Sequence, residues 1–312
     1  MQLAITSPDN TTTAASPVTL PQRVDHVFVP PIKCQGIKTK LVPFILSSVK
    51  WDGRGRWIEP FIGSGVVLFN LAPPRAYVAD TNKHIITLHR AIASGAITAS
   101  DVKDYLLREG SILVRRGDEY YYEVRNRFNR NPSSLDFLFL NRSCFNGVMR
   151  FNRKGEFNVP FGHKIDRFRQ AYITKITNQV ARLTSVMRGK DWTFAVADWR
   201  ETVAQAREGD FIYADPPYAG RHTDYYSAWT EGEASELMER LLTSPAGFAL
   251  STWSRNKYRD NPALRSAIPG TLIRTTRHFY HVGPSEDLRN EMEEALVIRD
   301  QSTAHGETAA GE

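Results

Sequence analysis

Short apolar runs alternate with helical patterns along most of this chain. Residues 57–61 and 77–80 have the composition of buried strands, and helical patterns follow them over residues 66–71 and 82–94. This alternation constrains the fold strongly, because neighbouring parallel strands need a crossover connection, which a helix usually supplies. The sequence therefore predicts an α/β fold with a mostly parallel, doubly wound sheet.

The same pattern continues in the last third of the chain. Apolar runs over residues 193–196, 209–214 and 248–251 predict further strands. Residues 38–50 and 232–243 carry the apolar spacing of amphipathic helices. These elements continue the same alternation of strands and helices.

Residues 100–190 interrupt this rhythm. The stretch is longer than a crossover needs and is rich in Arg, Asn and aromatic residues, so we expect an inserted, mainly helical subdomain. Residues 27–99 and 191–300 would then form the domain that contains the sheet. The two ends, residues 1–26 and 301–312, lack periodicity and are predicted to be flexible tails.

The composition limits the class of protein. With 312 residues, 41% of them hydrophobic, the chain can bury a sizeable core. It has no run of 18 apolar residues and no basic-then-apolar leader, so neither a membrane span nor a secretory signal is expected. Cys34 and Cys144 lack the spacing of a zinc site or a disulfide framework, which favours a reduced, cytoplasmic setting. The net charge of +6 is compatible with a polyanionic partner.

The strand expected at residues 209–214 ends in Asp215-Pro216-Pro217-Tyr218. The exocyclic amine of a nucleobase is a poor nucleophile, because its lone pair is delocalised into the ring. Asp215 can accept one N–H of such an amine, and the proline pair stiffens the turn and removes backbone donors. Tyr218 offers a face on which a flipped base can stack. An ordinary tight turn uses the same residue types, so the motif alone leaves both interpretations open.

A glycine-bearing turn follows the first expected strand. Gly63 and Gly65 allow a sharp turn and a close approach of a ligand, and Asp80 ends the next strand, where a carboxylate can bind ribose hydroxyls. The full G-x-G-x-x-G pattern is absent and Val66-Val67 follow instead. A nucleoside without phosphates therefore fits better than a dinucleotide, and S-adenosylmethionine is the leading candidate. Glycines required only for packing are the alternative.

Three further residues are candidates for the same ligand site. Lys38 lies near the start of the helix expected over residues 38–50, where a cation opposes the helix dipole, so it is expected to serve a ligand. Asp198 and Trp199 follow the strand expected over residues 193–196 and could flank an adenine ring. A single Trp is, however, more often a core residue.

Basic residues interleaved with phenylalanines are concentrated between residues 141 and 169. The charged residues there are Arg142, Arg150, Arg153, Lys154, Lys164, Arg167 and Arg169, against Glu156 and Asp166. This combination suits phosphate neutralisation together with stacking or wedging of bases. Asn146 and Arg150 are four residues apart, so on a helix they would face the same way and could read base edges. The alternative is a solvated basic surface over an ordinary phenylalanine core.

Five spaced motifs occur in the order found in one known family. They are residues 33–38, 59–65, 141–147, 153–162 and 215–218. The most specific are Asn-Arg-x-x-Phe-Asn-Gly and Gly-Glu-Phe-Asn-Val-Pro-Phe-Gly. From about residue 28 to residue 300, the chain resembles the D12 class of DNA adenine-N6 methyltransferases, the Dam family. The resemblance implies a Rossmann-like, S-adenosylmethionine-dependent methyltransferase sheet with a mainly helical target-recognition insert.

The resemblance also implies roles for individual residues. Asp215, Pro216, Pro217 and Tyr218 would hold a flipped adenine. The cofactor site would comprise Cys34, Gly36, Lys38, Glu59, Pro60, Phe61, Gly63, Gly65, Asp80, Asn82, Asp198, Trp199 and Asp215. The expected DNA-binding residues are Lys33, Arg142, Phe145, Asn146, Val148, Arg150, Asn152, Pro160 and Lys164. The family's target-reading part falls on residues 141–164, which we term the recognition segment.

Within this set, the family pattern implies distinct contacts with duplex DNA. Phe145 would wedge into the duplex, and Asn146 would contact a phosphate or a base. Arg150 would read a guanine, Val148 would touch a thymine methyl group, and Lys33 would read the first guanine. Family members with this set mostly modify the adenine of GATC, which is therefore the expected site.

The chain departs from the family pattern in the segment of residues 33–38, at His163-Lys164 and in the tail before residue 27. The family motif Lys-Trp-Ala-Gly-Gly-Lys reads Lys-Cys-Gln-Gly-Ile-Lys at residues 33–38, which removes a Trp that could stack on the cofactor. His163-Lys164 also differ and could change the preference for flanking bases.

The expected function is site-specific methylation of adenine N6 in double-stranded DNA, without a metal or a membrane partner. The oligomeric state stays open between a monomer and a weak dimer. One alternative is an amine methyltransferase acting on cytosine N4 or on RNA, because the same chemistry suits any planar amine. Another is a catalytically silent DNA-binding regulator. Restriction–modification, phage defence and repair marking are all compatible biological settings.

Overall fold

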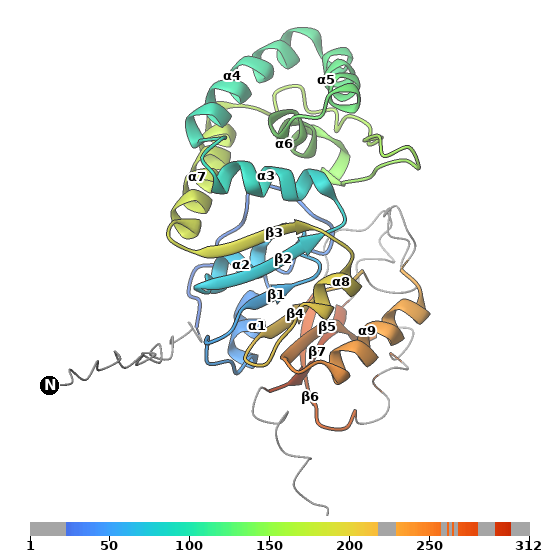
Figure 1. Ribbon diagram of the computed structural model, residues 1–312. Coiled ribbons are helices and arrows are strands. Elements are labelled where there is room, and N and C mark those ends of the chain that lie inside the picture. Colours follow the sequence, from blue (N-terminus) through green and yellow to red (C-terminus); the bar gives the residue numbers. More distant parts are fainter. Residues whose placement is uncertain are drawn as a thin grey trace, which may run out of the picture.

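The computed structural model describes residues 23–217, 229–256, 261, 264, 268–279 and 291–300. Figure 1 shows a central sheet with helices on both faces and a group of helices stacked beyond one edge of the sheet. Residues 1–22 and 301–312 of the predicted tails lie outside the described residues, as does Tyr218.

Seven strands of the described chain form one sheet in the order β3-β2-β1-β4-β5-β7-β6. They are β1 (Trp57–Glu59), β2 (Arg75–Asp80), β3 (Asp191–Val196), β4 (Phe211–Ala214), β5 (Gly247–Asn256), β6 (Leu272–Phe279) and β7 (Glu291–Arg299). Strands β1 to β5 pair in parallel, and β7 runs antiparallel to both β5 and β6. The fold is thus the predicted doubly wound α/β sheet of the Rossmann-like methyltransferase type.

The helices follow the predicted alternation closely. They are α1 (Val42–Ser48), α2 (Val66–Leu71), α3 (Lys83–Ala93), α4 (Ala99–Arg116), α5 (Asp118–Arg130), α6 (Ser134–Ser143), the 3₁₀ turn η1 (Phe145–Gly147), α7 (Gln170–Met187), α8 (Trp199–Ala204) and α9 (Glu231–Thr243). Only α1 differs clearly from its predicted range of 38–50. It begins at Val42 because Pro43 fits the first turn of a helix but not its interior.

The two faces of the sheet belong to different cores. Successive side chains of a strand point to opposite faces, so Trp57 and Phe211 enter the core shared with α1 and α2, whereas Ile58 and Ile212 pack with residues of α8 and α9. The rings of Trp57 and Phe211 stack with centroids 5.5 Å apart. Both faces are therefore buried, as a parallel sheet requires.

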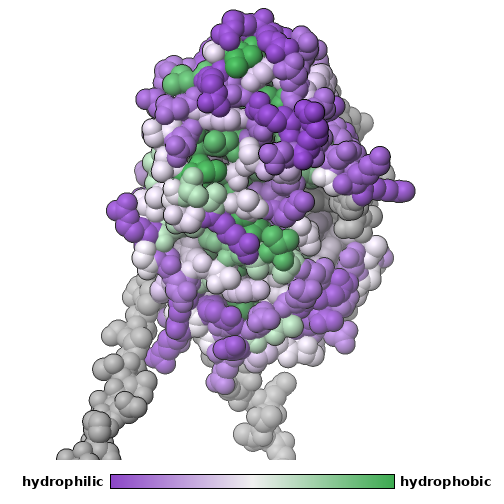
Figure 2. All heavy atoms as spheres, turned by 45° about the horizontal axis from the view of Figure 1, so that its top comes forward, coloured by the Kyte–Doolittle hydropathy of each residue, from purple (hydrophilic) through white to green (hydrophobic). Residues whose placement is uncertain are grey.

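Helices α4 to α7 form the insert, which stacks on α3 beyond the edge strand β3 (Figure 1). Its buried residues and those of α1, α2 and α3 form one continuous core. Figure 2 brings the insert forward and shows a mostly hydrophilic surface with small hydrophobic islands. The insert and the sheet are thus joined by apolar packing, in addition to the chain connections.

A buried polar network joins three helices of the insert. Arg127 on α5 donates to Asp136 on α6 through Nε at 3.0 Å, and to Glu109 on α4 through Nη2 at 3.0 Å. The hydroxyl of Tyr105 also donates to Asp136, and that of Tyr120 donates to Glu109 at 2.6 Å. The carboxylates of Asp136 and Glu109 are almost fully buried, so each depends on these donors for its solvation.

Candidate active site and nucleic-acid interface

Asp215 directly follows the central strand β4 and forms an ion pair inside the protein. Its Oδ1 lies 3.1 Å from Nζ of Lys38, which is only 4% exposed. Lys38 precedes α1, and its carbonyl accepts hydrogen bonds from Leu41 and Val42 at the start of that helix. The lysine near the helix start therefore serves a carboxylate of this site.

Other carboxylates surround this ion pair. Burial raises the pKa of Asp215, and Lys38 opposes that shift; a hydrogen bond from Ser251 also opposes it, whereas the charge of Glu294 adds to it. Burial raises the pKa of Glu59 to about 8, and the charge of Asp215 adds to this shift. The hydrogen bond that Trp57 Nε1 donates to Glu59 Oε1 at 2.7 Å opposes it. Three buried or half-buried carboxyl groups thus share the neighbourhood of one ammonium group.

The state of Glu59 makes the stability of the fold depend on pH. Its pKa lies above the ordinary value of 4.5 in the folded protein, so the folded state holds the proton more tightly than the unfolded state does. Stability should therefore fall as pH rises from about 4.5 to about 8. Glu59→Gln keeps an acceptor for Trp57 and removes the titration.

We expect the free energy of unfolding of Glu59→Gln, relative to the wild type, to rise by on the order of 3 kcal/mol between pH 5 and pH 8.5. Urea unfolding without ligand at both pH values measures this difference. Glu239→Gln on the exposed face of α9 is the control and should follow the wild type. A Glu59→Gln curve parallel to that of the wild type would contradict the assignment.

The glycine turn lies beside Asp215 at the carboxyl ends of the central strands. Gly63 and Gly65 have φ angles of +48° and +73°, a region that favours glycine. A Cβ on Gly65 would lie 2.4 Å from the ring of Phe69, so this position also needs glycine for space. The backbone N–H of Gly63 donates to Asp80 Oδ2 at 3.0 Å, and that of Asn82 donates to Oδ1 at 2.8 Å. Asp80 is therefore held rigidly at the end of β2.

The segment of residues 33–38 covers this turn. A Cβ on Gly63 would lie 3.7 Å from Sγ of Cys34, so the thiol packs against the turn. Burial, with a smaller contribution from Asp80, raises the pKa of Cys34, so the thiol is neutral. Gly36 has a φ angle of +71° and an exposed backbone. The predicted cofactor residues of this segment thus lie next to those of the glycine turn.

Trp199 differs from its expected placement. Its ring is only 3% exposed and packs against Phe61 and Trp229, with centroids 6.5 and 5.9 Å away. Asp198 caps α8 by accepting from the backbone N–H of Arg200 at 2.8 Å. Trp199 does follow a strand end, as predicted, but its ring packs in the core. Phe61 is half-buried and is therefore the more accessible aromatic residue. Pro60, beside it, is also buried.

The recognition segment is a looped hairpin instead of a helix. Isolated bridges join Cys144 to Phe161 and Phe151 to Phe157. Asn146 has a left-handed φ of +54°, and the chain leaves helical geometry there. Asn146 and Arg150 therefore do not share a helix face, because the left-handed backbone at Asn146 interrupts the helix and the chain continues to Arg150 as one arm of the hairpin.

Lys33 packs against this hairpin close to Phe145, although the two residues are far apart in sequence. The side chain of Asn141 clamps Lys33, accepting from its N–H at 2.8 Å and donating to its carbonyl at 2.9 Å. Gly147 packs on the same lysine, since a Cβ there would lie 2.4 Å from Lys33 Cδ. Phe145 is 52% exposed, and Asn146 beside it is exposed as well. The structure thus brings Lys33 to the turn that presents an unusually exposed phenylalanine.

Several other predicted DNA-binding residues have partners within the hairpin. Arg150 Nε donates to Asn158 Oδ1 at 2.9 Å, which fixes the guanidinium direction. Asn152 Oδ1 accepts from two backbone N–H groups of its own turn. The carbonyl of Pro160, whose ring is exposed, accepts from Phe145 N–H at 2.9 Å. Val148 is half-buried and Lys164 is exposed.

Arg142 is not at the surface, contrary to its predicted contact with DNA. It is 5% exposed and donates to Gln179 Oε1 at 2.8 Å and to the hydroxyl of Tyr172 at 3.2 Å. The reason is its position on the inner side of α6, which is buried along its whole second half. The motif predicted a functional arginine without indicating which way its side chain points.

Two classes of feature are missing from the residues that the structure describes. None of their helices is long and apolar enough to cross a membrane. Within the same residues, no three His, Cys, Asp or Glu side chains cluster in a way that could hold a metal ion.

The chain is similar in sequence to a known family and to several known proteins. Residues 35–261 match the family described as D12 class N6 adenine-specific DNA methyltransferase. The chain is 31% identical over 239 residues to the retron Ec67 DNA adenine methylase of Escherichia coli, covering 72% of this chain and 73% of that protein. It is 32% identical over 200 residues to a DNA adenine methylase of Serratia marcescens, covering 59% and 68%. It is 29% identical over 209 residues to the type II methyltransferase M.MjaIII of Methanocaldococcus jannaschii, covering 61% and 68%.

Proposed function

We propose a target site and a mechanism for this chain, which belongs to the D12 class of N6 adenine-specific DNA methyltransferases. The proposed target is the adenine of GATC in duplex DNA, flipped out of the helix before methyl transfer. The observation that carries the proposal is the position of Asp215, held by Lys38 at the carboxyl end of β4 beside the glycine turn. In open α/β sheets, ligands bind at this end of the strands and at the point where strand order reverses.

The residues at this end of the sheet fit S-adenosylmethionine. Asp80 is fixed by two backbone N–H groups and retains lone pairs for the hydroxyls of a ribose. The carboxyl groups of Glu59, Asp215 and Glu294 suit a sulfonium and an amino group, and a bound cation would favour the charged form of Glu59, whose pKa burial raises. When bound, S-adenosylmethionine supplies a methyl group that is already activated by the sulfonium. Lys38, by contrast, is engaged with Asp215.

The chain's own contribution is to hold and polarise the target amine. Asp215 would accept one N–H of adenine N6, and a carbonyl of the proline turn would accept the other. Pro216 and Pro217 have no backbone N–H, so the turn presents acceptors without competing donors. Tyr218, which lies outside the described residues, would stack on the flipped base. Positioning and electrostatics would supply most of the rate enhancement.

The recognition segment would read the bases around the target. Phe145 has the exposure that a wedge between base steps requires. Arg150, oriented by Asn158, would take the two acceptors of a guanine. Lys33, clamped by Asn141, would read the first guanine from the opposite side of the same turn. Asn146 and Val148 would complete the contacts, with a phosphate or base and with a thymine methyl group.

Methyl transfer from labelled S-adenosylmethionine to a GATC duplex and to a scrambled duplex tests the proposal. We expect N6-methyladenine, identified by mass spectrometry of the nucleosides, only in the GATC duplex. N4-methylcytosine, or label in RNA alone, would replace the proposed substrate with another amine. Calorimetry measures the binding of S-adenosylmethionine separately from methyl transfer. Cofactor binding without transfer to any duplex would favour a catalytically silent DNA-binding protein.

A further inference from the structure

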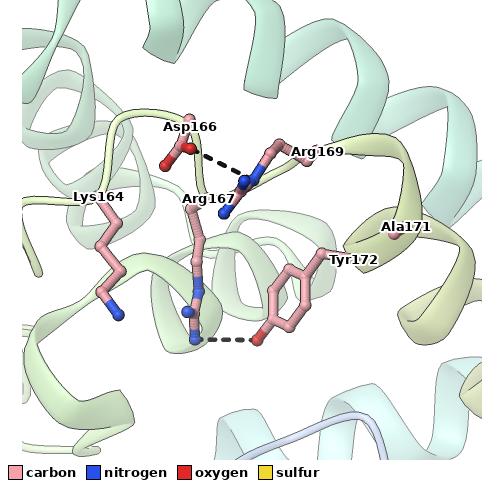
Figure 3. Close-up of a pocket in the computed structure, with 6 residues that line it drawn as sticks. All are labelled: Lys164, Asp166, Arg167, Arg169, Ala171 and Tyr172. Atoms are coloured by element: carbon pink, nitrogen blue, oxygen red, sulfur yellow. Dashed lines mark hydrogen bonds and ion pairs between the residues drawn. The ribbon is translucent and has the colours of Figure 1, made fainter.

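A basic cavity of about 400 Å³ lies between the end of the recognition segment and the start of α7. Figure 3 shows the residues that line it: Lys164, Asp166, Arg167, Arg169, Ala171 and Tyr172. Three of them are cations and only one is a carboxylate. The function proposed above uses no residue of this cavity, although Lys164 is among the DNA-binding residues that the resemblance implies.

The charged side chains of the lining all come from one short segment, residues 164–169. Asp166 pairs with Arg169 Nε at 3.2 Å, and the side chains of both residues are largely exposed. Arg167 donates to the hydroxyl of Tyr172 at 3.1 Å, and Lys164 extends in the same direction as Arg167 (Figure 3). The cavity therefore offers several N–H donors directed at one space.

A second layer of cations lies behind Tyr172. Arg142 donates to the same hydroxyl from the buried side, and its Nε has no hydrogen-bond partner among the described residues. Burial would raise the pKa of Tyr172, but the charges of Arg142, Lys33 and Arg167 outweigh it and lower that pKa. The guanidinium groups of Arg142 and Arg167 thus converge on one phenol. Such an excess of positive charge attracts an anion.

The first turn of α7 adds to this field. The helix has 18 residues, its N-cap is Arg169, and neither a side-chain cap nor an acidic residue satisfies its first turn. The first N–H groups of a helix lack intrahelical acceptors, and the helix dipole favours an anion there. The lining cations and the helix start therefore act in the same direction.

We propose that this cavity binds a phosphate of the DNA backbone, outside the bases that the recognition segment reads. The inference rests on the proposed function, because Arg167 Nε donates to the carbonyl of Arg142 at 2.9 Å, which joins the cavity to the start of the recognition segment and so places it along the duplex. Its donors match phosphate oxygens, and a phosphate contact carries no sequence information. The contact would anchor the duplex and fix its register beside the active site.

The test measures equilibrium binding of fluorescent duplexes over a range of salt concentrations. Arg169→Ala and Lys164→Ala should each weaken binding about 5- to 10-fold near 0.1 M salt, equally for GATC and scrambled duplexes. Each should reduce the slope of log K against log salt by about 1. Arg188→Ala, at the exposed opposite end of α7, is the matched control and should change neither value. Asp166→Asn should have the opposite sign and tighten binding.

Neutral methylphosphonates then locate the contact. One substituted position in the duplex should weaken binding by the wild type, cause a smaller loss with Arg169→Ala, and cause no further loss when Arg169→Ala and Lys164→Ala are combined. Equal slopes for Arg169→Ala and Arg188→Ala, or the absence of any such position, would overturn the proposal. If either of these results is obtained while the wild type methylates GATC, the phosphate site is rejected and the proposed function stands. If the variants change the slope as predicted but the wild type does not methylate DNA, the proposed function is rejected and the phosphate site stands.

Discussion

Replacing Asp215 by alanine should reduce methyl transfer by about 10³-fold or more while duplex binding stays within about twofold of the wild type. The carboxylate is the proposed acceptor for the target amine, whereas the proposed DNA contacts lie on the recognition segment. Single-turnover transfer to a GATC duplex, with binding measured in parallel, separates the two effects. Transfer by Asp215→Ala at a rate near that of the wild type would exclude the proposed mechanism.

The same substitution disturbs the fold, so it needs controls. It removes the carboxylate that contacts buried Lys38, which should cost about 3–5 kcal/mol of stability. The double variant Lys38→Met with Asp215→Ala should recover much of that stability and remain inactive. Asp215→Asn keeps the shape and one acceptor, so its transfer rate should lie between those of the wild type and the alanine variant.

The second large effect concerns the insert. Asp136→Ala should lower the free energy of unfolding by about 3–5 kcal/mol, because it leaves the buried hydroxyl of Tyr105 and the guanidinium of Arg127 without their shared acceptor. Urea unfolding measures the loss. Asp118→Ala, at an exposed position in the first turn of α5, is the matched control and should change stability by less than about 1 kcal/mol. A loss below about 1 kcal/mol for Asp136→Ala would show that water replaces the carboxylate easily.

The sequence predicted those parts of the fold that depend on local chemistry. The strands before the glycine turn and before Asp215, and the helices after them, follow from apolar periodicity and from Gly and Pro positions. Trp199 shows where this reasoning ends, because residue type and position predicted its place at a strand end but not its burial. Arg142 is the same case on α6, where a basic residue that was predicted to bind DNA points into the core.

Contacts between distant segments could not be predicted from any local sequence pattern. The pairing of Lys38 with Asp215 depends on how α1 packs beside β4, and the approach of Ser251 and Glu294 depends on the order β4-β5-β7. Asn141 lies within a motif, yet its hydrogen bonds to Lys33 span 108 residues of sequence. The helical expectation for Asn146 and Arg150 was wrong because left-handed backbone at Asn146 is set by the hairpin contacts around it.

The continuous core beneath the insert restricts how this protein can be re-engineered. Side chains of α3 such as Ile85 and Ile86 belong to the same buried cluster as Leu106 and Ile176 of the insert. Excising α4 to α7 as a cassette, or exchanging them for those of a relative, would open that cluster to water on the sheet side. A transplant of target specificity is therefore better confined to the hairpin that carries Phe145, whose exposed turn can change without reopening the apolar contact.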